Sequence, residues 1–269
     1  MSHKDVGGRR LKLRIALGRT LAVLPLLWRR AAGALALCAA AWLVPAVWAP
    51  TGWMVWLWGL AAIVMTVLAV GALSRLAISD DLGGARRLGL GPLGLQAGLP
   101  EARLIGAALL CLLFLAMIVC ILALVVLAVF GMAELNVQAI QVRDWAAVGE
   151  PWKLGVLAAL GLGAVAVPLL LIVRLSLFAP ATLGRRQMVS LNSMGIAYGS
   201  FWQILAGLIV TALPKIVLLV LMGTGLLVGK AGQVVCVLGL VGLQLPLTLG
   251  FLGAAYRQLE YWSPEEPKR

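Results

Sequence analysis

Long apolar stretches alternate along the chain with shorter segments that contain most of the charged residues. Six of the stretches are long enough for a transmembrane helix, which needs about 20 mainly apolar residues. They cover residues 31–49, 52–73, 104–130, 154–173, 201–223 and 233–255. The pattern predicts an all-α, polytopic membrane protein with six transmembrane helices. It divides the chain into a basic cytoplasmic or interfacial segment (1–30), a six-helix transmembrane domain (31–255) and a cytoplasmic tail (256–269).

Composition agrees with a lipid environment. Hydrophobic residues make up 62% of the chain and charged residues 12%, whereas soluble domains contain about 25% charged residues. The net charge of +12 is spread over short clusters between apolar runs. A nucleic-acid-binding domain would gather such charge on one solvated surface, so we expect no nucleic-acid partner. The clusters favour contact with anionic membrane lipids on the cytoplasmic face.

The positions of the basic residues predict the orientation. The first 30 residues contain eight Lys or Arg, the 74–104 connection four, the 174–200 connection three and the tail three. The segments expected on the opposite side contain three, namely Arg143, Lys153 and Lys230. Because cytoplasmic connections are enriched in Lys and Arg, both termini are predicted to be cytoplasmic.

Two segments 99 residues apart share an arginine pattern. "SRLAISDDLGGARR" begins at residue 74 and "VRLSLFAPATLGRR" at residue 173, and their three arginines match without gaps. The sixth stretch also ends near an arginine, in "AAYRQLEYW". We interpret the chain as three tandem hairpin repeats, each preceded by a cytoplasmic interfacial segment. The arginines at these boundaries are expected to contact lipid headgroups, because arginine stems can lie along acyl chains. They are Arg75, Arg86, Arg87, Arg174, Arg185, Arg186 and Arg257.

The most basic interfacial segment is the N-terminal "RRLKLRIALGRTLAVLPLLW". Its charges are scattered around a helical wheel, so it is expected to be attracted to the membrane surface without presenting a clean amphipathic face.

The sequence also carries a family resemblance. "RLSLFAP" leaving one stretch and "GSFWQILAGLIV" entering the next resemble the YciC-like bacterial inner-membrane proteins. They are also similar to the membrane domain of the glycerophosphodiester phosphodiesterase family. The resemblance is clearest over residues 154–259. It implies a multi-pass helical protein of the bacterial inner membrane, and it supplies no catalytic residues.

Catalytic, cofactor and metal sites are not expected. The four cysteines form no C-x-x-C pair, and the one histidine is His3. These facts argue against zinc sites and against histidine-based catalysis. The carboxylates are dispersed, without a pair placed for general acid–base chemistry. "GLGPLG" (89–94) fits a dinucleotide-binding pattern, but it lacks the strand–turn–helix context and is interpreted as a glycine-rich turn.

Lys215 and Gln244 are the candidate intramembrane polar site. Lys215 lies within the fifth apolar stretch, and Gln244 could lie at a similar depth in the sixth. A lysine inside a membrane costs about 2.5–3.5 kcal/mol on insertion scales, so it needs water or a partner. Two interpretations stay open. The pair could bind an ion, proton or anionic substrate, or Lys215 could reach the outer surface or be tied to Gln244 and a backbone carbonyl.

These observations predict a non-catalytic accessory, scaffolding or lipid-contacting component of the bacterial envelope. Its expected partners are membrane lipids and a larger membrane protein complex. The alternative is a small transporter or channel with its site near Lys215 and Gln244.

Overall fold

A computed structural model describes residues 10–79, 81–132, 136–143 and 150–260, and every regular element among them is a helix. In chain order the elements are α1 (Leu13–Arg30), α2 (Ala32–Trp48), α3 (Trp53–Ile78), α4 (Leu82–Arg87), η1 (Pro92–Gly94), α5 (Leu99–Met132), α6 (Val137–Gln141), α7 (Pro151–Leu175), α8 (Phe178–Arg185), α9 (Ser193–Ile196), α10 (Phe201–Thr211), α11 (Leu213–Gly223), α12 (Gly229–Gly239), η2 (Leu240–Gln244) and α13 (Leu245–Leu259).

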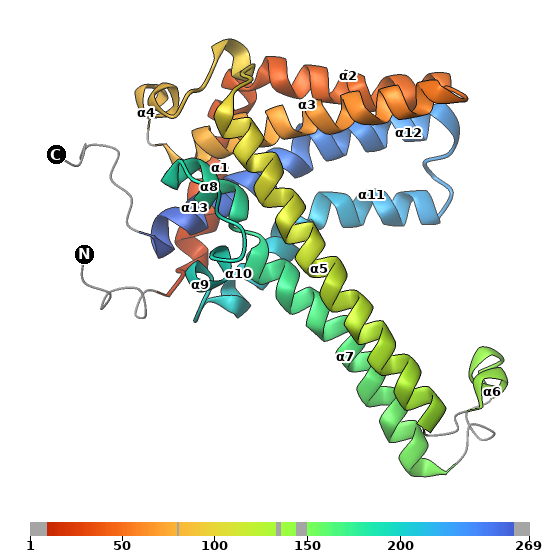
Figure 1. Ribbon diagram of the computed structural model, residues 1–269. Coiled ribbons are helices and arrows are strands. Elements are labelled where there is room, and N and C mark those ends of the chain that lie inside the picture. The colour runs from red at the N-terminus through yellow and green to blue at the C-terminus, as the bar shows by residue number, and fades with distance from the viewer. Residues whose placement is uncertain (1–9, 80, 133–135, 144–149, 261–269) are drawn as a thin grey trace.

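The long helices form three hairpins that leave one common end of the molecule (Figure 1). The first is α2–α3 and the second is α5–α7. In the third hairpin, α10 and α11 lead away from the common end, and α12, η2 and α13 return to it. Short helices α4, α8 and α9 lie at the common end, which we call the base. The described chain begins and ends there, since the backbone N–H of Lys12 donates to Oε1 of Gln258 over 2.9 Å.

Four helical segments are long and apolar enough to cross a membrane. They are Trp53–Ile78, Pro92–Met132, Trp152–Arg185 and Gly229–Leu259. Two further candidates are bent helix pairs, α1 with α2 at 78° and α10 with α11 at 49°. The described chain therefore has four such segments, or up to six if each bent pair is counted as one span. This arrangement is that of a multi-pass membrane protein.

The N-terminal basic segment is more ordered than its charge pattern predicts. Residues 13–30 form α1, which packs against α13 and α3. Ala16, Thr20, Leu24 and Leu27 are buried at helical spacing and make one continuous stripe. Outside this stripe Ile15 and Leu21 are exposed among the arginines, so the remaining surface of α1 is mixed, as the scattered charges predict.

Helix α13 is the centre of the base, and glycines let its neighbours approach closely. A Cβ on Gly207 of α10 would lie 1.9 Å from the Phe251 ring, and one on Gly253 would lie 2.4 Å from the Ala77 Cβ. Phe251 is fully buried. Side chains at these glycine positions would overlap their neighbours, so the glycines set the distances from α13 to α10 and α3.

The segment Gly229–Leu259 contains a π-helical turn, η2, which ends two residues before Pro246. Proline has no N–H, so the carbonyl of Gly242, four residues earlier, loses its α-helical donor. The indole Nε1–H of Trp28 donates to that carbonyl over 2.7 Å. A side chain of α1 thus satisfies the backbone where the helix is irregular, as an apolar environment requires.

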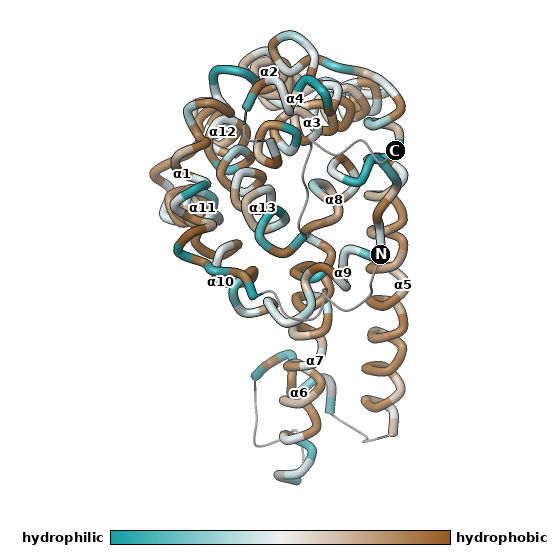
Figure 2. Tube along the Cα trace, turned by 90° about the vertical axis from the view of Figure 1, so that its left-hand side faces the viewer, coloured by the Kyte–Doolittle hydropathy of each residue, from teal (hydrophilic) through white to brown (hydrophobic). Residues whose placement is uncertain are grey.

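Helices α5 and α7 project from the base with apolar surfaces along most of their length (Figure 2). Leu113 on α5 is 67% exposed and Leu162 on α7 is 72% exposed. Such a continuous apolar surface is not stable in water, and it is suited to contact with acyl chains.

Candidate functional site

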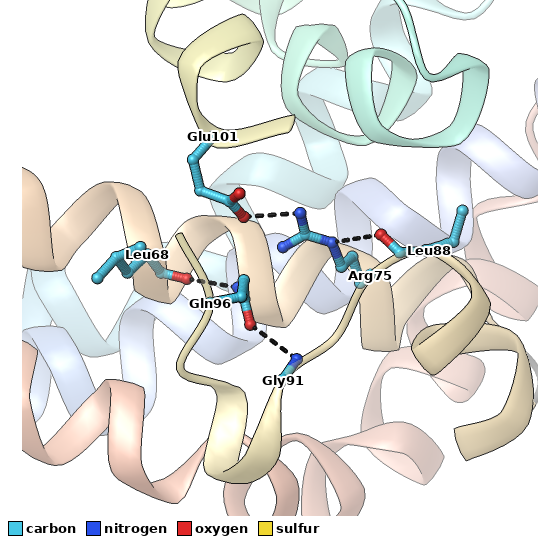
Figure 3. Close-up of polar contacts among 6 residues, drawn as sticks. All are labelled: Leu68, Arg75, Leu88, Gly91, Gln96 and Glu101. Carbon is cyan, nitrogen blue, oxygen red and sulfur yellow. Dashed lines mark hydrogen bonds and ion pairs between the residues drawn. The ribbon is translucent and has the colours of Figure 1, made fainter. Parts of the chain in front are cut away.

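Arg75 and Glu101 form a buried ion pair at the base. Arg75 lies in the last turn of α3, and Glu101 lies in the first turn of α5. Arg75 Nη2 is 2.6 Å from Glu101 Oε1, and the two side chains are 1% and 8% exposed. Arg75 Nε also donates to the Leu88 carbonyl over 2.9 Å (Figure 3). The pair therefore ties α3 to α5 and to the segment that follows α4.

Gln96 completes the surroundings of Arg75. With its amide oxygen toward Arg75, Gln96 accepts from Arg75 Nη1 over 2.8 Å and from the Ala72 N–H over 3.1 Å, and it donates to the Gly94 carbonyl over 2.9 Å. Figure 3 shows the opposite amide orientation, with longer bonds to Gly91 and Leu68 of 3.4 and 3.3 Å. We assign the first orientation because the amide oxygen then faces donors and the amide nitrogen faces an acceptor.

The burial of Arg75 corrects one sequence-based prediction. Arg75 was expected to contact lipid headgroups, but its exposed fraction is 0% and its guanidinium faces Glu101 and Leu88. A buried charge is tolerated only with a partner and further hydrogen bonds, and Arg75 has both. Its contribution is to hold the base together.

A cavity of about 260 Å³ lies next to this ion pair. It is bounded by the end of α4, the start of α5 and the end of α8, and Leu88 belongs both to its wall and to the surroundings of Arg75. Three arginines line it, namely Arg87, Arg103 and Arg186. Among the residues that the structure describes, its lining contains no carboxylate.

Two of these arginines are oriented by backbone carbonyls. Arg186 Nη2 donates to the Arg87 carbonyl over 2.8 Å, and Arg103 Nη1 donates to the Arg186 carbonyl over 2.5 Å. The Arg87 side chain makes no hydrogen bond or ion pair with any residue that the structure describes. Arg87 and Arg186 are the positions that match at the 99-residue spacing, and they meet at this cavity.

The other predicted headgroup contacts have mixed surroundings. Arg86 is exposed, and Arg185 is exposed but paired through Nε with Glu260 Oε1 at 2.6 Å. Arg257 is partly buried and donates to the Ile78 carbonyl over 2.9 Å. Arg174 is partly buried, and its Nε has no hydrogen-bond partner within the described part of the chain.

The structure does not bring Lys215 and Gln244 into hydrogen-bonding contact. Lys215 is exposed near the start of α11, whereas Gln244 Nε2 donates to Thr248 Oγ1 over 2.8 Å within its own helix. Gln244 Oε1 is buried without a hydrogen-bond partner among the described residues. The break between α10 and α11 falls at Ala212, two residues before Pro214.

Glu101, Gln96 and Arg103 are the site residues that the sequence interpretation missed. A usable signal existed for Glu101, because it is an acid just before a long apolar run and an acid is favourable in the first turn of a helix.

"GLGPLG" forms the turn around η1, as its glycine content indicates. His3 and residues 261–269 of the tail lie outside the described residues. Within the described ranges, no group of three or more His, Cys, Asp or Glu could hold a metal ion.

Comparison with known proteins adds no relative. Neither protein-family models nor curated proteins nor solved structures give a significant match to the chain. The resemblance to the YciC-like and phosphodiesterase membrane domains therefore stays a prediction.

Proposed function

We propose that this chain is a non-catalytic, multi-pass protein of the bacterial inner membrane with both termini in the cytoplasm. It acts as an accessory, scaffolding or lipid-contacting component of the envelope. Its base binds anionic lipid on the cytoplasmic face, and its apolar hairpins contact acyl chains or a membrane protein partner.

The arginine-lined cavity at the foot of α5 carries this proposal. Arg87, Arg103 and Arg186 line one small volume, and no carboxylate of the described ranges lines it with them. Arg103 is followed at once by the apolar run of α5 that begins at Leu104. If α5 crosses the membrane, Arg103 lies where the acyl region gives way to phosphates, and arginine is suited to bind phosphate there.

The test is extraction of the tagged full-length chain from its membrane into polymer-bounded native nanodiscs. Co-purifying lipids and proteins are then quantified against the bulk membrane. We expect a higher ratio of anionic to zwitterionic lipid than in the bulk. A stoichiometric membrane protein would identify the accessory role, and lipid alone would identify the lipid-contacting role. A bulk-like lipid ratio with no partner protein would overturn the proposal.

A transporter or channel with its site near Lys215 and Gln244 is the second candidate. The observation that favours it is the buried, unpartnered Oε1 of Gln244 at the end of a π-helical turn, since such turns are frequent at functional sites. Loss of solute flux in proteoliposomes on Lys215→Ala, with the fold retained, would support it. Equal flux through protein-free liposomes would exclude it.

A further inference from the structure

We propose that the cavity between α4, α5 and α8 binds a single phosphate group, with a phosphomonoester favoured over a phosphodiester. This inference rests on the proposed contact with anionic lipid and deepens it, because it names the chemical group and the residues that hold it. Arg87, Arg103 and Arg186 are the binding residues.

The charges in the cavity call for an anion. Three guanidiniums line a volume of about 260 Å³, and none of them forms an ion pair with a described carboxylate. Arg75 and Arg185, by contrast, each have a glutamate within 2.6 Å. Like charges held close together repel one another unless an opposite charge lies between them. A phosphomonoester, with about −1.5 to −2 charge at neutral pH, compensates them better than a singly charged diester.

The hydrogen-bond donors are also available. Each guanidinium has about five N–H donors in a planar fork that matches phosphate oxygens. Arg103 and Arg186 each donate through one nitrogen to a backbone carbonyl. This bond orients the guanidinium, and its other N–H donors remain available for a ligand. The Arg87 side chain makes no bond to the described residues. Two of the three guanidiniums, those of Arg103 and Arg186, are thus oriented before a ligand arrives, which lowers the cost of binding an oxygen anion.

The size and the rigidity of the cavity fit a small group. Its volume lies just below the roughly 300–1,000 Å³ of pockets for drug-sized ligands. One wall is held by the Arg75–Glu101 pair through the Leu88 carbonyl. Another wall contains Thr182, which is buried and hydrogen-bonded to Val189 over 3.1 Å. Arg186 itself adopts a left-handed backbone with φ of 53° at the end of α8. Glycine is the residue that most often adopts this conformation at the end of a helix.

The experiment uses the full-length chain in a neutral detergent. Its thermal unfolding temperature is followed during titration with dioctanoyl phosphatidate, dioctanoyl phosphatidylglycerol, dioctanoyl phosphatidylcholine or inorganic phosphate, because a ligand of the folded state raises this temperature. The first variant is Arg87→Gln, because the Arg87 side chain makes no hydrogen bond or ion pair with a described residue. Its matched control is Arg86→Gln, an exposed arginine on the same helix outside the cavity lining. The second cavity variant is the double substitution Arg103→Gln with Arg186→Gln. Its control is the double substitution Arg29→Gln with Arg30→Gln, because both double variants remove two positive charges.

We expect phosphatidate to bind more tightly than phosphatidylglycerol, and phosphatidylcholine not to bind. The cavity variants should weaken phosphatidate binding about tenfold or more, while the controls stay within about twofold. Inorganic phosphate binding with the same dependence on Arg87 would support the site with a soluble anion as its source. Anionic lipid binding that is weakened equally by Arg86→Gln and Arg87→Gln would overturn the cavity site and leave the proposed function standing. No preference of the wild-type chain for any anionic lipid would overturn both the phosphate site and the proposed contact of the base with anionic lipid.

Discussion

The guanidinium of Arg75 and the carboxylate of Glu101 are both removed from solvent, so each charge depends on the other. Their separation is 2.6 Å, and the Leu88 carbonyl and the Gln96 amide take up further donors of Arg75. Removing one partner of such a pair leaves a buried charge without compensation, which costs about 3–5 kcal/mol. Removing both avoids most of that penalty.

Glu101→Leu should therefore lower the free energy of unfolding by about 3–5 kcal/mol, measured by detergent-induced unfolding of the purified chain. The double variant Arg75→Met with Glu101→Leu should lose less than the sum of the two single variants, because they share one interaction. Arg86→Gln, an exposed substitution, is the control and should stay within about 0.5 kcal/mol. Strictly additive losses would show that the two charges do not stabilise each other.

The sequence could predict where arginines concentrate but not what each one faces. Arg75 and Arg174 have the same local context, each at the end of an apolar run, yet only Arg75 is fully buried. Arg75 is buried because Glu101 is brought to it by the turn around η1, 26 residues farther along the chain. Arg87 and Arg186 meet because α4 and α8 end at the same cavity. Both facts depend on tertiary contacts that a local pattern does not contain.

Close approach between helices is set by single glycines, of which Gly207 is the clearest. A methyl group there would overlap the buried Phe251 ring. Gly207→Ala should destabilise the chain by about 1–3 kcal/mol, because the core is too dense to accept the extra carbon. Gly161→Ala on α7 has no heavy atom within 4 Å of the added carbon and should be neutral or stabilising, since alanine favours helix. Thermal unfolding of both variants in one detergent makes the comparison, and equal unfolding temperatures would contradict it.

Hydropathy predicted most of the long apolar helices, whereas the bends between helices were predictable only in part. The predicted stretches at 104–130, 154–173 and 233–255 each fall within a segment that is long and apolar enough to cross a membrane, and the stretch at 52–73 matches another to within one residue at its start. The bend before Pro214 follows from proline chemistry. The 78° bend between α1 and α2 carries no proline at the junction. It arises where α1 turns to pack its buried stripe against α13, which only the tertiary structure shows.

At the scale of the whole molecule, all three hairpins lead away from the base, with α5–α7 diverging from the other two (Figure 1). Their far connections, between α2 and α3, α5 and α7, and α11 and α12, lie away from the ends of the described chain (Figure 1). The predicted excess of Lys and Arg falls on the base side of every hairpin. Two independent features, chain path and charge, thus divide the molecule in the same way. Together they favour the base as the cytoplasmic side.

This orientation can be measured with a membrane-impermeant maleimide on intact spheroplasts. In a background with the four native cysteines replaced by alanine, single cysteines are introduced at Thr51, Lys230 and Arg86, all exposed in the structure. Thr51 and Lys230 lie at far connections and should be labelled from outside, because positively charged segments are retained in the cytoplasm. Arg86→Cys at the base should react only after permeabilisation, which also proves that the position is reactive. Labelling of Arg86→Cys in intact spheroplasts, with Thr51→Cys protected, would place the base outside and remove the anionic cytoplasmic leaflet as its ligand.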